Sequence, residues 1–469
     1  MRMRRKEKGE GRTEKGILFS KFCHVKTFIY LLSPIFYLFS PLQAQPQQLP
    51  IDTLKFAHFE DNRIYFDRDS SNLLYFFDKF NKVVMSGEGN VNIVHIGGSH
   101  VQAGVLPHRI RRNILQAYPG MIARRGMIFP YSCAKKCNNP LDYKVSKEGD
   151  FNLIRNVYND LLRPLGATGI AVYTADTTVQ IQIKMNDQSL RFETERILLF
   201  GFSDSGTAMP RIVIDSVTYE FTEHDSALRC YTYEVPMFTD SFFVKINLVD
   251  SGDVFTLTGL FLDNDRPGIT YHSLGVNGAS VPSFLKCEYF EQDMRIIDPD
   301  LVIFGLGIND ASGDNFDTLE FVNNYLTLLG RFKEVNPNCA FIFITNNDSY
   351  KRIAKGKYAV NKCGSIVREQ FYKLANMTKS GVWDQFHIMG GLKSMDQWCH
   401  DKYAKVDRVH FTNKGYELLG DLFFNAFLAT QLDCSDLKML KELKSDFENT
   451  INEDMPERVR ESEIDNKIE

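Results

Sequence analysis

The stretch Val91–His100 constrains the fold of this chain more than any other. It begins as an apolar run with β-branched side chains, which is typical of a buried strand in a parallel sheet. It ends in two glycines, Ser99 and a histidine, and a helical pattern takes over after Gly104. A strand, a tight glycine turn, a serine and a helix together raise a hydroxyl above the carboxyl edge of an α/β sheet. The alternative is that Ser99 only caps the following helix, so the other predicted strand ends must decide between the two.

Two hydrophobic patterns divide the chain. Residues 45–135 and 269–432 alternate between apolar runs that fit buried strands and periodic apolar faces that fit helices, which predicts an α/β domain with a parallel sheet. Residues 140–268 instead show a period of two broken by turn clusters, which predicts an inserted all-β sandwich. The alternation is clearest in the run Val179, Gln180, Ile181, Gln182 and Ile183. Residues 433–469 are charged, and we expect them to form a helical or loose tail.

The N-terminal residues have the composition of an export signal. Residues 1–26 carry nine Lys and Arg against three Glu, and the uncharged stretch 27–44 is rich in Phe, Tyr, Leu and Ile. A basic region, a short apolar region and a small residue at Ala44 are typical of a secretory signal peptide. The apolar stretch is short for a membrane span and contains two prolines. We therefore expect residues 1–44 to be removed and the mature protein, without a membrane span, to be periplasmic or extracellular. A retained membrane anchor is the alternative.

Charge and cysteine content exclude other classes of protein. The formal net charge is −4 and no stripe of Lys and Arg recurs in the body of the chain, so the sequence predicts no nucleic-acid partner. The nine cysteines are widely spread, and a chain of 469 residues can bury a large core without disulfides, so we expect scattered buried thiols. Cys133 and Cys137 lie close together, but no second His or Cys pair completes a zinc pattern.

Chemically distinctive residues also follow the other predicted strands. A strand near residue 270 leads into Gly275-Val276-Asn277-Gly278, and a strand at 300–305 leads into Gly307-Ile308-Asn309-Asp310. The segment Asp407-Arg408-Val409-His410 stands just before the last predicted helix. Because functional groups collect at the carboxyl ends of parallel strands, we expect these segments to meet the turn at Ser99.

These residues supply the parts of a serine nucleophile site. The hydroxyl of Ser99 needs a base within hydrogen-bond reach, and His410 is the best candidate, with Asp407 near enough to orient its imidazole. The tetrahedral intermediate needs donors for its oxyanion, which the backbone N–H of Gly278, the side-chain amide of Asn309 and the N–H of Ser99 itself can provide. Each motif also has a plain structural interpretation, as a helix cap, a β-turn or a turn glycine, and it is their combination that favours catalysis.

Three further histidines need an interpretation. His95 lies within the strand and is expected in the core. His100 follows the serine and is expected to point away from the site. His272 precedes the glycine turn and is a candidate for lining the cleft, with no role assigned.

Taken together, the four segments resemble the four sequence blocks of the SGNH (GDSL-type) hydrolase superfamily. The resemblance covers about 45–135 and 270–432. It implies a three-layer α/β/α sandwich with a parallel sheet, in which Ser99 is the nucleophile and Gly278 and Asn309 are the oxyanion donors. It also implies that His410 is the base and that Asp407 orients it.

One position departs from the family pattern. The first block usually reads Gly-Asp-Ser, and here Gly98 stands in place of the aspartate. That aspartate is not the proton shuttle, so the chemistry need not be lost. It helps to hold the nucleophile turn, however, so a catalytically inactive relative is an open alternative.

The layout further resembles peptidoglycan O-acetylesterases and their acetyltransferase relatives, in which a β-sandwich similar to carbohydrate-binding modules is inserted between the first and second blocks. The stretch 271–279 is particularly similar to that group. The resemblance implies an exported serine esterase, a carboxylic ester hydrolase of the acetylesterase kind, that removes O-acetyl groups from a cell-envelope or other polysaccharide. Its partner would be an acetylated glycan, and its chemistry needs no metal or organic cofactor. An O-acetyltransferase and an inactive glycan-binding protein remain the alternatives.

Overall fold

The computed structural model of this chain describes residues 46–454 except 69, 134–136, 187–189, 191 and 313–314. The predicted signal peptide, residues 1–44, lies outside the described residues. The chain divides into a unit of residues 1–47 and a unit of residues 48–469, and the fold below is that of the second unit. In the part that is described, no helix is long and apolar enough to span a membrane.

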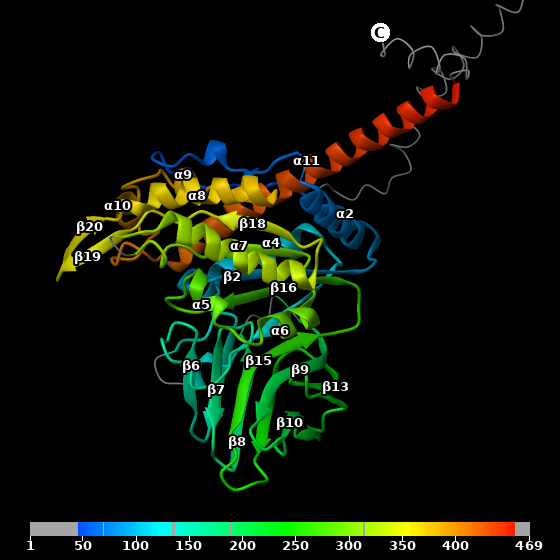
Figure 1. The fold of residues 1–469 in the computed structure, drawn as a ribbon, viewed down its shortest axis with the longest axis vertical. Helices are drawn as coiled ribbons and strands as arrows, with labels where there is room; N and C mark the ends of the chain where they lie inside the picture. The colour runs from blue at the N-terminus through cyan, green and yellow to red at the C-terminus, as the bar shows by residue number, and fades with distance from the viewer. Residues whose placement is uncertain are drawn as a thin grey trace, which may run out of the picture. The chain divides into compact units, whose positions relative to one another are not determined.

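A seven-stranded sheet forms the centre of the α/β part (Figure 1). Strand β1 runs antiparallel to its neighbour β21, and the other neighbouring strands run parallel. In spatial order the strands are β1 (Ile64–Tyr65), β21 (Gly381–Trp383), β18 (Ala340–Ile344), β17 (Leu301–Gly305), β2 (Asn90–Gly97), β16 (Gly268–Gly275) and β3 (Ile122–Arg124).

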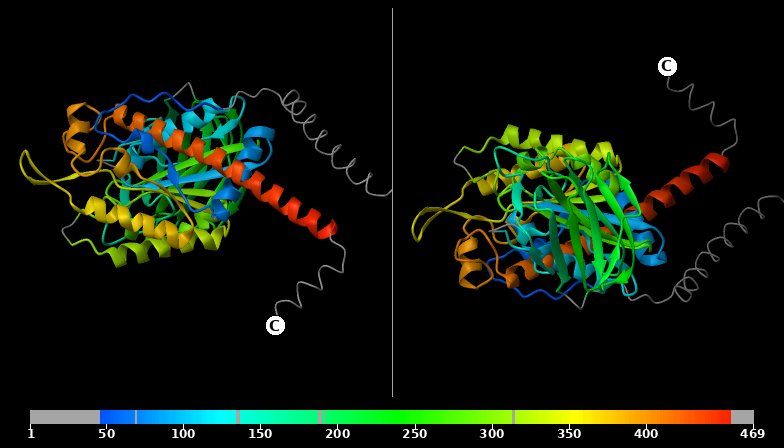
Figure 2. Two further views of the ribbon diagram at one scale, coloured as in Figure 1. Left: turned by 90° about the horizontal axis from the view of Figure 1, so that it is seen from above. Right: turned by 90° about the horizontal axis from the view of Figure 1, so that it is seen from below.

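Helices cover both faces of this sheet because its strands are apolar on both sides. Along β17, Leu301 and Ile303 belong to the core formed with α2, α4 and α11, whereas Val302 and Phe304 belong to the core formed with α6, α7 and α8. Figure 2 shows α11 on one side of the sheet and the yellow-green α7 and yellow α8 on the other. The predicted three-layer α/β/α architecture is therefore confirmed. The helices are α2 (Ser71–Ser86), α4 (Val105–Ala117), α5 (Val281–Leu285), α6 (Phe290–Ile297), α7 (Thr318–Val335), α8 (Cys363–Thr378) and α11 (Asn413–Asp454).

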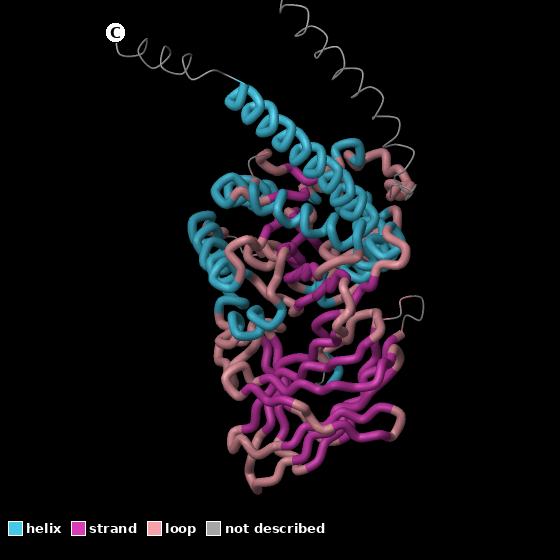
Figure 3. The backbone as a smooth tube through the Cα atoms, turned by 90° about the vertical axis from the view of Figure 1, so that its right-hand side faces the viewer, coloured by secondary structure: helices cyan, strands magenta, loops and turns pink. Residues whose placement is uncertain are grey.

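The inserted region consists of two antiparallel sheets that share one core, as predicted (Figure 3). In β8, Val179, Ile181 and Ile183 are buried between the sheets while Gln180 and Gln182 face outward, which explains the period of two. One sheet contains β11 (Val217–Tyr219), β10 (Met209–Ile214), β14 (Ser241–Asn247), β8 (Thr178–Met185) and β5 (Tyr143–Glu148). The other contains β12 (Glu223–Asp225), β13 (Cys230–Phe238), β9 (Thr194–Ser203), β15 (Phe255–Asp263), β7 (Ile170–Thr174), β6 (Asn152–Arg155) and β4 (Gly126–Ile128).

The chain enters and leaves the inserted region through neighbouring strands of the central sheet. It enters after β3 and returns as β16, which pairs with both β3 and β2. The sequence of residues 124–131 predicts a loop, but within it β4 pairs with β15 and adds one strand to the inserted region from before residue 140. Met127 and Ile128 on this strand are buried, so the pairing is supported by side-chain burial as well as by backbone hydrogen bonds.

Two elements differ from what their sequence pattern predicts. The pattern of residues 280–297 predicts one helix, but the structure breaks it between α5 and α6, where the N–H of Tyr289 donates to the carbonyl of Leu165 in the inserted region. The pattern of residues 382–388 predicts a strand, but the strand ends at Trp383, and α9 (Gln385–Ile388) begins because the Asp384 carboxylate accepts the N–H of His387 as an N-cap.

Some further elements are not predicted by the apolar periodicity of the sequence. These are α3 (Ser99–Gln102), α10 (Met395–His400) and the hairpin of β19 (Tyr350–Ala354) and β20 (Lys357–Val360). Helix α11 continues beyond residue 432, so the charged tail begins as helix. The eight cysteines in the described part of the chain are free thiols, and six of them are buried.

Candidate active site

Ser99 follows β2, the middle one of three neighbouring strands in the central sheet. Strand β2 ends at Gly97, and α3 begins at Ser99. A Cβ atom at Gly97 would lie 2.4 Å from Cγ2 of Val101, so the turn closes tightly only with glycine at this position. In the order β17-β2-β16, Ser99 has the ends of the two neighbouring strands on either side, which is the arrangement that places functional groups together in an α/β sheet.

A hydrogen-bonded chain runs from Ser99 to Asp407. The Oγ of Ser99 lies 2.8 Å from Nε2 of His410, and Nδ1 of His410 lies 2.9 Å from Oδ2 of Asp407. The second carboxylate oxygen of Asp407 accepts the N–H groups of Val409 and His410 at 3.0 and 2.9 Å. With an N–H on Nδ1 donated to Asp407, Nε2 is the acceptor that a serine hydroxyl requires.

The environment of Asp407 keeps it ionised. Partial burial raises the pKa of its carboxyl, but the hydrogen bonds from the backbone N–H groups of His410 and Val409 and from the imidazole outweigh burial and hold the pKa below its usual value. A permanent negative charge therefore lies beside Nδ1 of His410, where it orients the ring and stabilises the imidazolium that would form after proton transfer.

The loop that carries Asp407 and His410 is held by a residue that the sequence analysis did not single out. Arg408 adopts a left-handed backbone conformation, with φ of 60°, and its carbonyl accepts the N–H of Tyr350 at 3.1 Å. Its guanidinium pairs with Asp396 at 3.1 Å and lies over the rings of Tyr350 and Tyr358. The β19–β20 hairpin thus fixes the loop between its two functional residues. An Arg inside an Asp-x-x-His motif gives no sequence signal for this contact.

The two predicted oxyanion donors lie at the flanking strand ends. Gly278 follows β16 with φ of 84°, a conformation that favours glycine. Asn309 follows β17, and its Nδ2 donates to the carbonyl of Ala279 at 2.9 Å, which ties the two loops together. Ser99, Gly278, Asn309 and His410 line one open pocket of about 490 Å³. The structure therefore brings all five predicted site residues to one place.

The position of the missing aspartate has its own geometry. A Cβ atom at Gly98 would lie 3.0 Å from Nδ2 of Asn309, closer than ordinary van der Waals contact. The amide of Asn309 thus occupies the space beside Gly98 and is oriented by Ala279 rather than by a carboxylate at position 98. The turn that carries Ser99 is assembled in this chain without a side chain at position 98.

Gln102 connects three segments of the site and was missed at the sequence level. Its Oε1 accepts the N–H of Asn277 at 2.7 Å, directly before Gly278. Its Nε2 donates to the carbonyl of Asn138 at 3.2 Å, at the entrance to the inserted region. The side chain is almost fully buried. A single glutamine in the turn after a strand gives no signal for such a role, because glutamine is normally exposed.

The structure shows where the three further histidines of the sequence analysis lie. His95 is buried and hydrogen bonded to Tyr271 at 3.0 Å, as expected of a core residue. His272 does not line the active-site pocket: it is buried, and its Nδ1 accepts the N–H of Met127 on β4 at 3.1 Å. His100, as expected, does not line the active-site pocket, but its ring contacts that of His410.

His100 packs behind the proposed base. Its ring centroid lies 5.3 Å from that of His410, and its Nδ1 is hydrogen bonded to the hydroxyl of Tyr416 at 2.8 Å. Burial, with a smaller contribution from His410, lowers the pKa of His100 to about 3. His100 is therefore neutral at ordinary pH and adds no positive charge beside His410.

The comparisons with known proteins agree with this fold. The sequence model of the GDSL-like Lipase/Acylhydrolase family matches residues 237–423, a range that contains Gly278, Asn309, Asp407 and His410 and begins after Ser99. No curated protein sequence matches the chain. A solved peptidoglycan O-acetylesterase superposes with a TM-score of 0.61 at 18% identity, over 80% of this chain and 98% of the other.

Two further solved structures share a smaller part of the chain. An acetyl xylan esterase has a TM-score of 0.27 at 17% identity, covering 34% of this chain and 80% of its own. A GDSL-like lipase from Bacteroides thetaiotaomicron has a TM-score of 0.25 at 17% identity, covering 32% of this chain and 72% of its own. By the family match, residues 237–423 belong to the GDSL-like lipase/acylhydrolase family, and the chain as a whole has the fold of a serine esterase of this type.

Proposed function

We propose that this protein is an exported serine esterase that removes O-acetyl groups from a cell-envelope or other polysaccharide. The observation that carries the proposal is the hydrogen-bonded chain from Ser99 through His410 to Asp407, in a pocket that also contains Gly278 and Asn309. The basic and apolar pattern of residues 1–44 supports export. The likeness to a peptidoglycan O-acetylesterase over 80% of the chain supports an acetyl ester on a glycan as the substrate.

The first half of the proposed reaction forms an acetyl-enzyme. The Oγ of Ser99 attacks the carbonyl carbon of the acetyl ester while Nε2 of His410 takes its proton. The negative charge that develops on the carbonyl oxygen is stabilised by the N–H of Gly278 and the amide of Asn309. His410, held by Asp407, then gives its proton to the departing sugar oxygen, and the bond between that oxygen and the acetyl carbon breaks.

The second half releases acetate. A water molecule gives a proton to His410 as its oxygen attacks the acetyl-enzyme, and His410 returns the proton to Oγ of Ser99 when acetate leaves. If a sugar hydroxyl took the place of water, the same residues would transfer the acetyl group instead of hydrolysing it. Product analysis with an added acceptor glycan separates the two reactions.

The lining of the pocket supports a carbohydrate substrate. Besides the proposed catalytic groups, the amide side chains of Asn138, Asn139 and Asn277 and the ammonium of Lys405 line it. Amides donate and accept hydrogen bonds in the way that sugar hydroxyls require. Asn138 and Asn139 belong to the segment that enters the inserted β-rich region, so that region takes part in forming the pocket. We propose that it also orients the glycan.

The test is hydrolysis of p-nitrophenyl acetate and release of acetate from an acetylated polysaccharide by the mature chain. We expect Ser99→Ala to lower kcat by about 10³-fold or more on both substrates, while Ser146→Ala, an exposed serine on β5, leaves it unchanged. Full activity in Ser99→Ala would overturn the nucleophile assignment. Binding of the polysaccharide with no turnover in the wild type would favour the glycan-binding alternative.

A further inference from the structure

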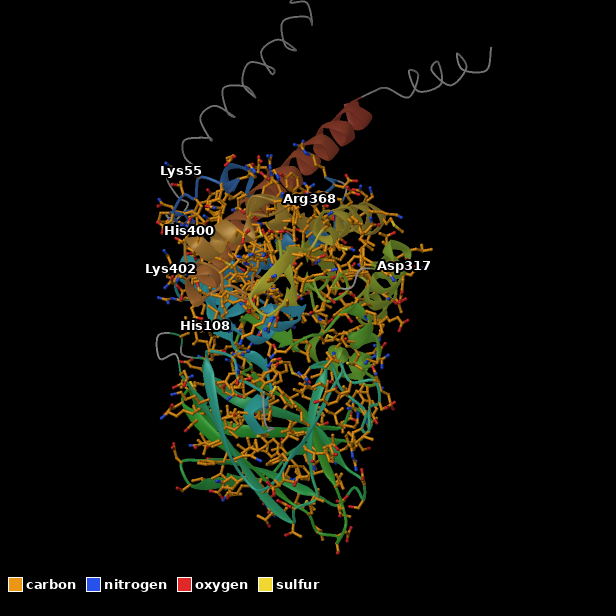
Figure 4. The ribbon with its side chains drawn as sticks, turned by 90° about the vertical axis from the view of Figure 1, so that its left-hand side faces the viewer. Lys55, His108, Asp317, Arg368, His400 and Lys402 are labelled. Carbon is orange, nitrogen blue, oxygen red and sulfur yellow. The ribbon has the colours of Figure 1, made fainter. Side chains whose placement is uncertain are left out.

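A second groove lies next to the active-site pocket and is not used by the proposed chemistry. It measures about 470 Å³ and lies between α4 and the first strand of the inserted region, β5. Figure 4 labels His108, one of its lining residues, at the level where the helices meet the strands of the inserted region. The lining is mostly charged: His108, Arg109, Arg112, Asp142, Lys144 and Glu417 surround it.

Part of this charge is already neutralised inside the protein. Burial raises the pKa of Asp142, but Arg125 and Arg111 outweigh burial and hold it below the usual value, and both guanidinium groups lie in ion-pair contact with the carboxylate. The guanidinium of Arg109 binds both carboxylate oxygens of Asp421, at 2.6 and 2.8 Å. These pairs leave little charge for a ligand.

Two cations in the groove are left without such a partner. Within the described residues, no ion pair or hydrogen bond occupies the guanidinium of Arg112 or the ammonium of Lys144, and Nε of Arg112 is enclosed with no acceptor. Lys144 is exposed, and across the sheet it pairs with Lys184, which adds positive charge beside the groove. Glu417, the one free acid in the lining, lies near Arg109 and contributes to the electrostatic field on that guanidinium. The groove therefore presents uncompensated positive charge in a chain whose formal net charge is −4.

The groove lies beside the active-site pocket, on the same two segments of the chain. Ala103 and Asn139 line the active-site pocket, and two positions further along each segment Val105 and Leu141 line the groove. Between them the chains are in contact: a Cβ atom at Gly104 would lie 2.5 Å from Cβ of Pro140. A polymer whose reacting residue is in the active-site pocket would therefore reach the groove by passing over the contact between Gly104 and Pro140.

We propose that this groove is a subsite for an anionic group, a carboxylate or a phosphate, carried by a neighbouring unit of the glycan chain. Arg112 would bind it through its planar fork of N–H donors and Lys144 through its ammonium. A volume of about 470 Å³ is of the size that one sugar residue with its substituent fills. The subsite deepens the proposed function, on which its catalytic meaning rests, because it makes the preferred substrate an acidic polysaccharide.

Binding tests the subsite without any need for turnover. The full mature chain carrying Ser99→Ala is titrated calorimetrically with three oligosaccharide probes: oligogalacturonate for carboxylate, a glycerol-phosphate oligomer for phosphate, and xylo-oligosaccharide as the neutral probe. We expect one of the two anionic probes to bind at least about tenfold more tightly than the neutral one, and the preferred probe identifies the anionic group. Adding Arg112→Gln with Lys144→Gln abolishes this preference, while Lys357→Gln, a control at an exposed lysine on β20 that does not line the groove, retains it. Equal binding of all three probes, or a preference that survives Arg112→Gln with Lys144→Gln, overturns the proposal.

Kinetics separate the subsite from the chemistry. In the chain with Ser99 intact, Arg112→Gln with Lys144→Gln is expected to raise KM for an acetylated acidic polysaccharide by about tenfold and to leave kcat/KM for p-nitrophenyl acetate unchanged, because that ester is too small to reach the groove. Loss of activity on both substrates would indicate a folding or catalytic defect and would overturn the subsite. If the wild type hydrolysed neither substrate, the proposed function would fail while the binding result above still decided the subsite.

Discussion

The Oγ of Ser99 lies 2.8 Å from Nε2 of His410, although 311 positions separate the two residues in the chain. Ser99 is fixed by the end of a central strand, and His410 by a loop that Arg408 attaches to the β19–β20 hairpin. The distance between the proposed nucleophile and the proposed base is therefore set by two independent parts of the fold, and variants of either part can be tested separately from Ser99 itself.

Replacing the orienting acid should slow the reaction without removing the nucleophile. Asp407→Asn removes the charge that stabilises the imidazolium and favours the wrong tautomer of His410, so we expect kcat to fall by roughly 10³-fold. Asp401→Asn is the matched control, because Asp401 pairs with the exposed His400 at 2.7 Å outside the site. Steady-state hydrolysis of p-nitrophenyl acetate measures both. A loss of less than tenfold in Asp407→Asn would mean that Asp407 does not orient the base.

Gly98 should be sensitive to a methyl group and less so to a carboxylate. Gly98→Ala places a Cβ atom against Nδ2 of Asn309 and displaces the amide, so we expect kcat to fall by about tenfold or more. Gly98→Asp adds the same Cβ but offers the amide an acceptor, so its loss should be smaller. Gly330→Ala, at a helical glycine with open space around it, is the control. If Gly98→Ala matched the wild type in kcat, the placement of Asn309 would not limit catalysis.

Gln102 should act as a positioning residue for the oxyanion loop. Gln102→Leu removes the acceptor of the Asn277 N–H, and we expect kcat to fall by about 10- to 100-fold with little change in KM for a small ester. Gln102→Glu keeps that acceptor and loses the donor to Asn138, so it should restore most of kcat. Parallel losses in kcat and in thermal stability, with no rescue by glutamate, would indicate a purely structural role.

Acid should destabilise the fold through its buried neutral histidines. Burial, with a contribution from Arg111, lowers the pKa of His95 to about 3, whereas an unfolded histidine titrates near its ordinary value of about 6.5. Between these two values the unfolded chain binds a proton that the folded chain does not. The stability is therefore intact above about pH 6.5 and falls by up to about 1.4 kcal/mol per pH unit as the pH drops toward about 3.

A pair of variants isolates this contribution. His95→Phe removes the titrating ring from the core, so its free energy of unfolding should fall less steeply with acid than that of the wild type. His400→Phe, at a histidine whose side chain is 80% exposed, should keep the slope of the wild type. Urea unfolding at several pH values between 7 and 4 measures the slopes, and parallel curves for His95→Phe and the wild type would contradict the assignment.

The periodic parts of the chain could be predicted because their signals are local. The apolar run that becomes β2 and the helical face of α11 each need only their own residues to be interpreted, and the motifs that follow the strands meet because parallel strands end at one edge. The role of Gln102 could not be predicted, since both of its partners are backbone groups of distant segments. The break before α6 depends on a carbonyl in the inserted region for the same reason.

The inserted region begins and ends on two strands, β3 and β16, that lie side by side in the central sheet. During synthesis, the strand that carries Ser99 is made first, and β16, which brings Gly278 beside it, is made only after the whole insertion. If the insertion is still unfolded, pairing β16 with β2 closes a very long flexible loop. Once the two inserted sheets have formed, the flexible part of that loop is much shorter, and closing it costs less entropy. Folding of the insertion thus lowers the entropic cost of bringing the proposed oxyanion loop beside Ser99.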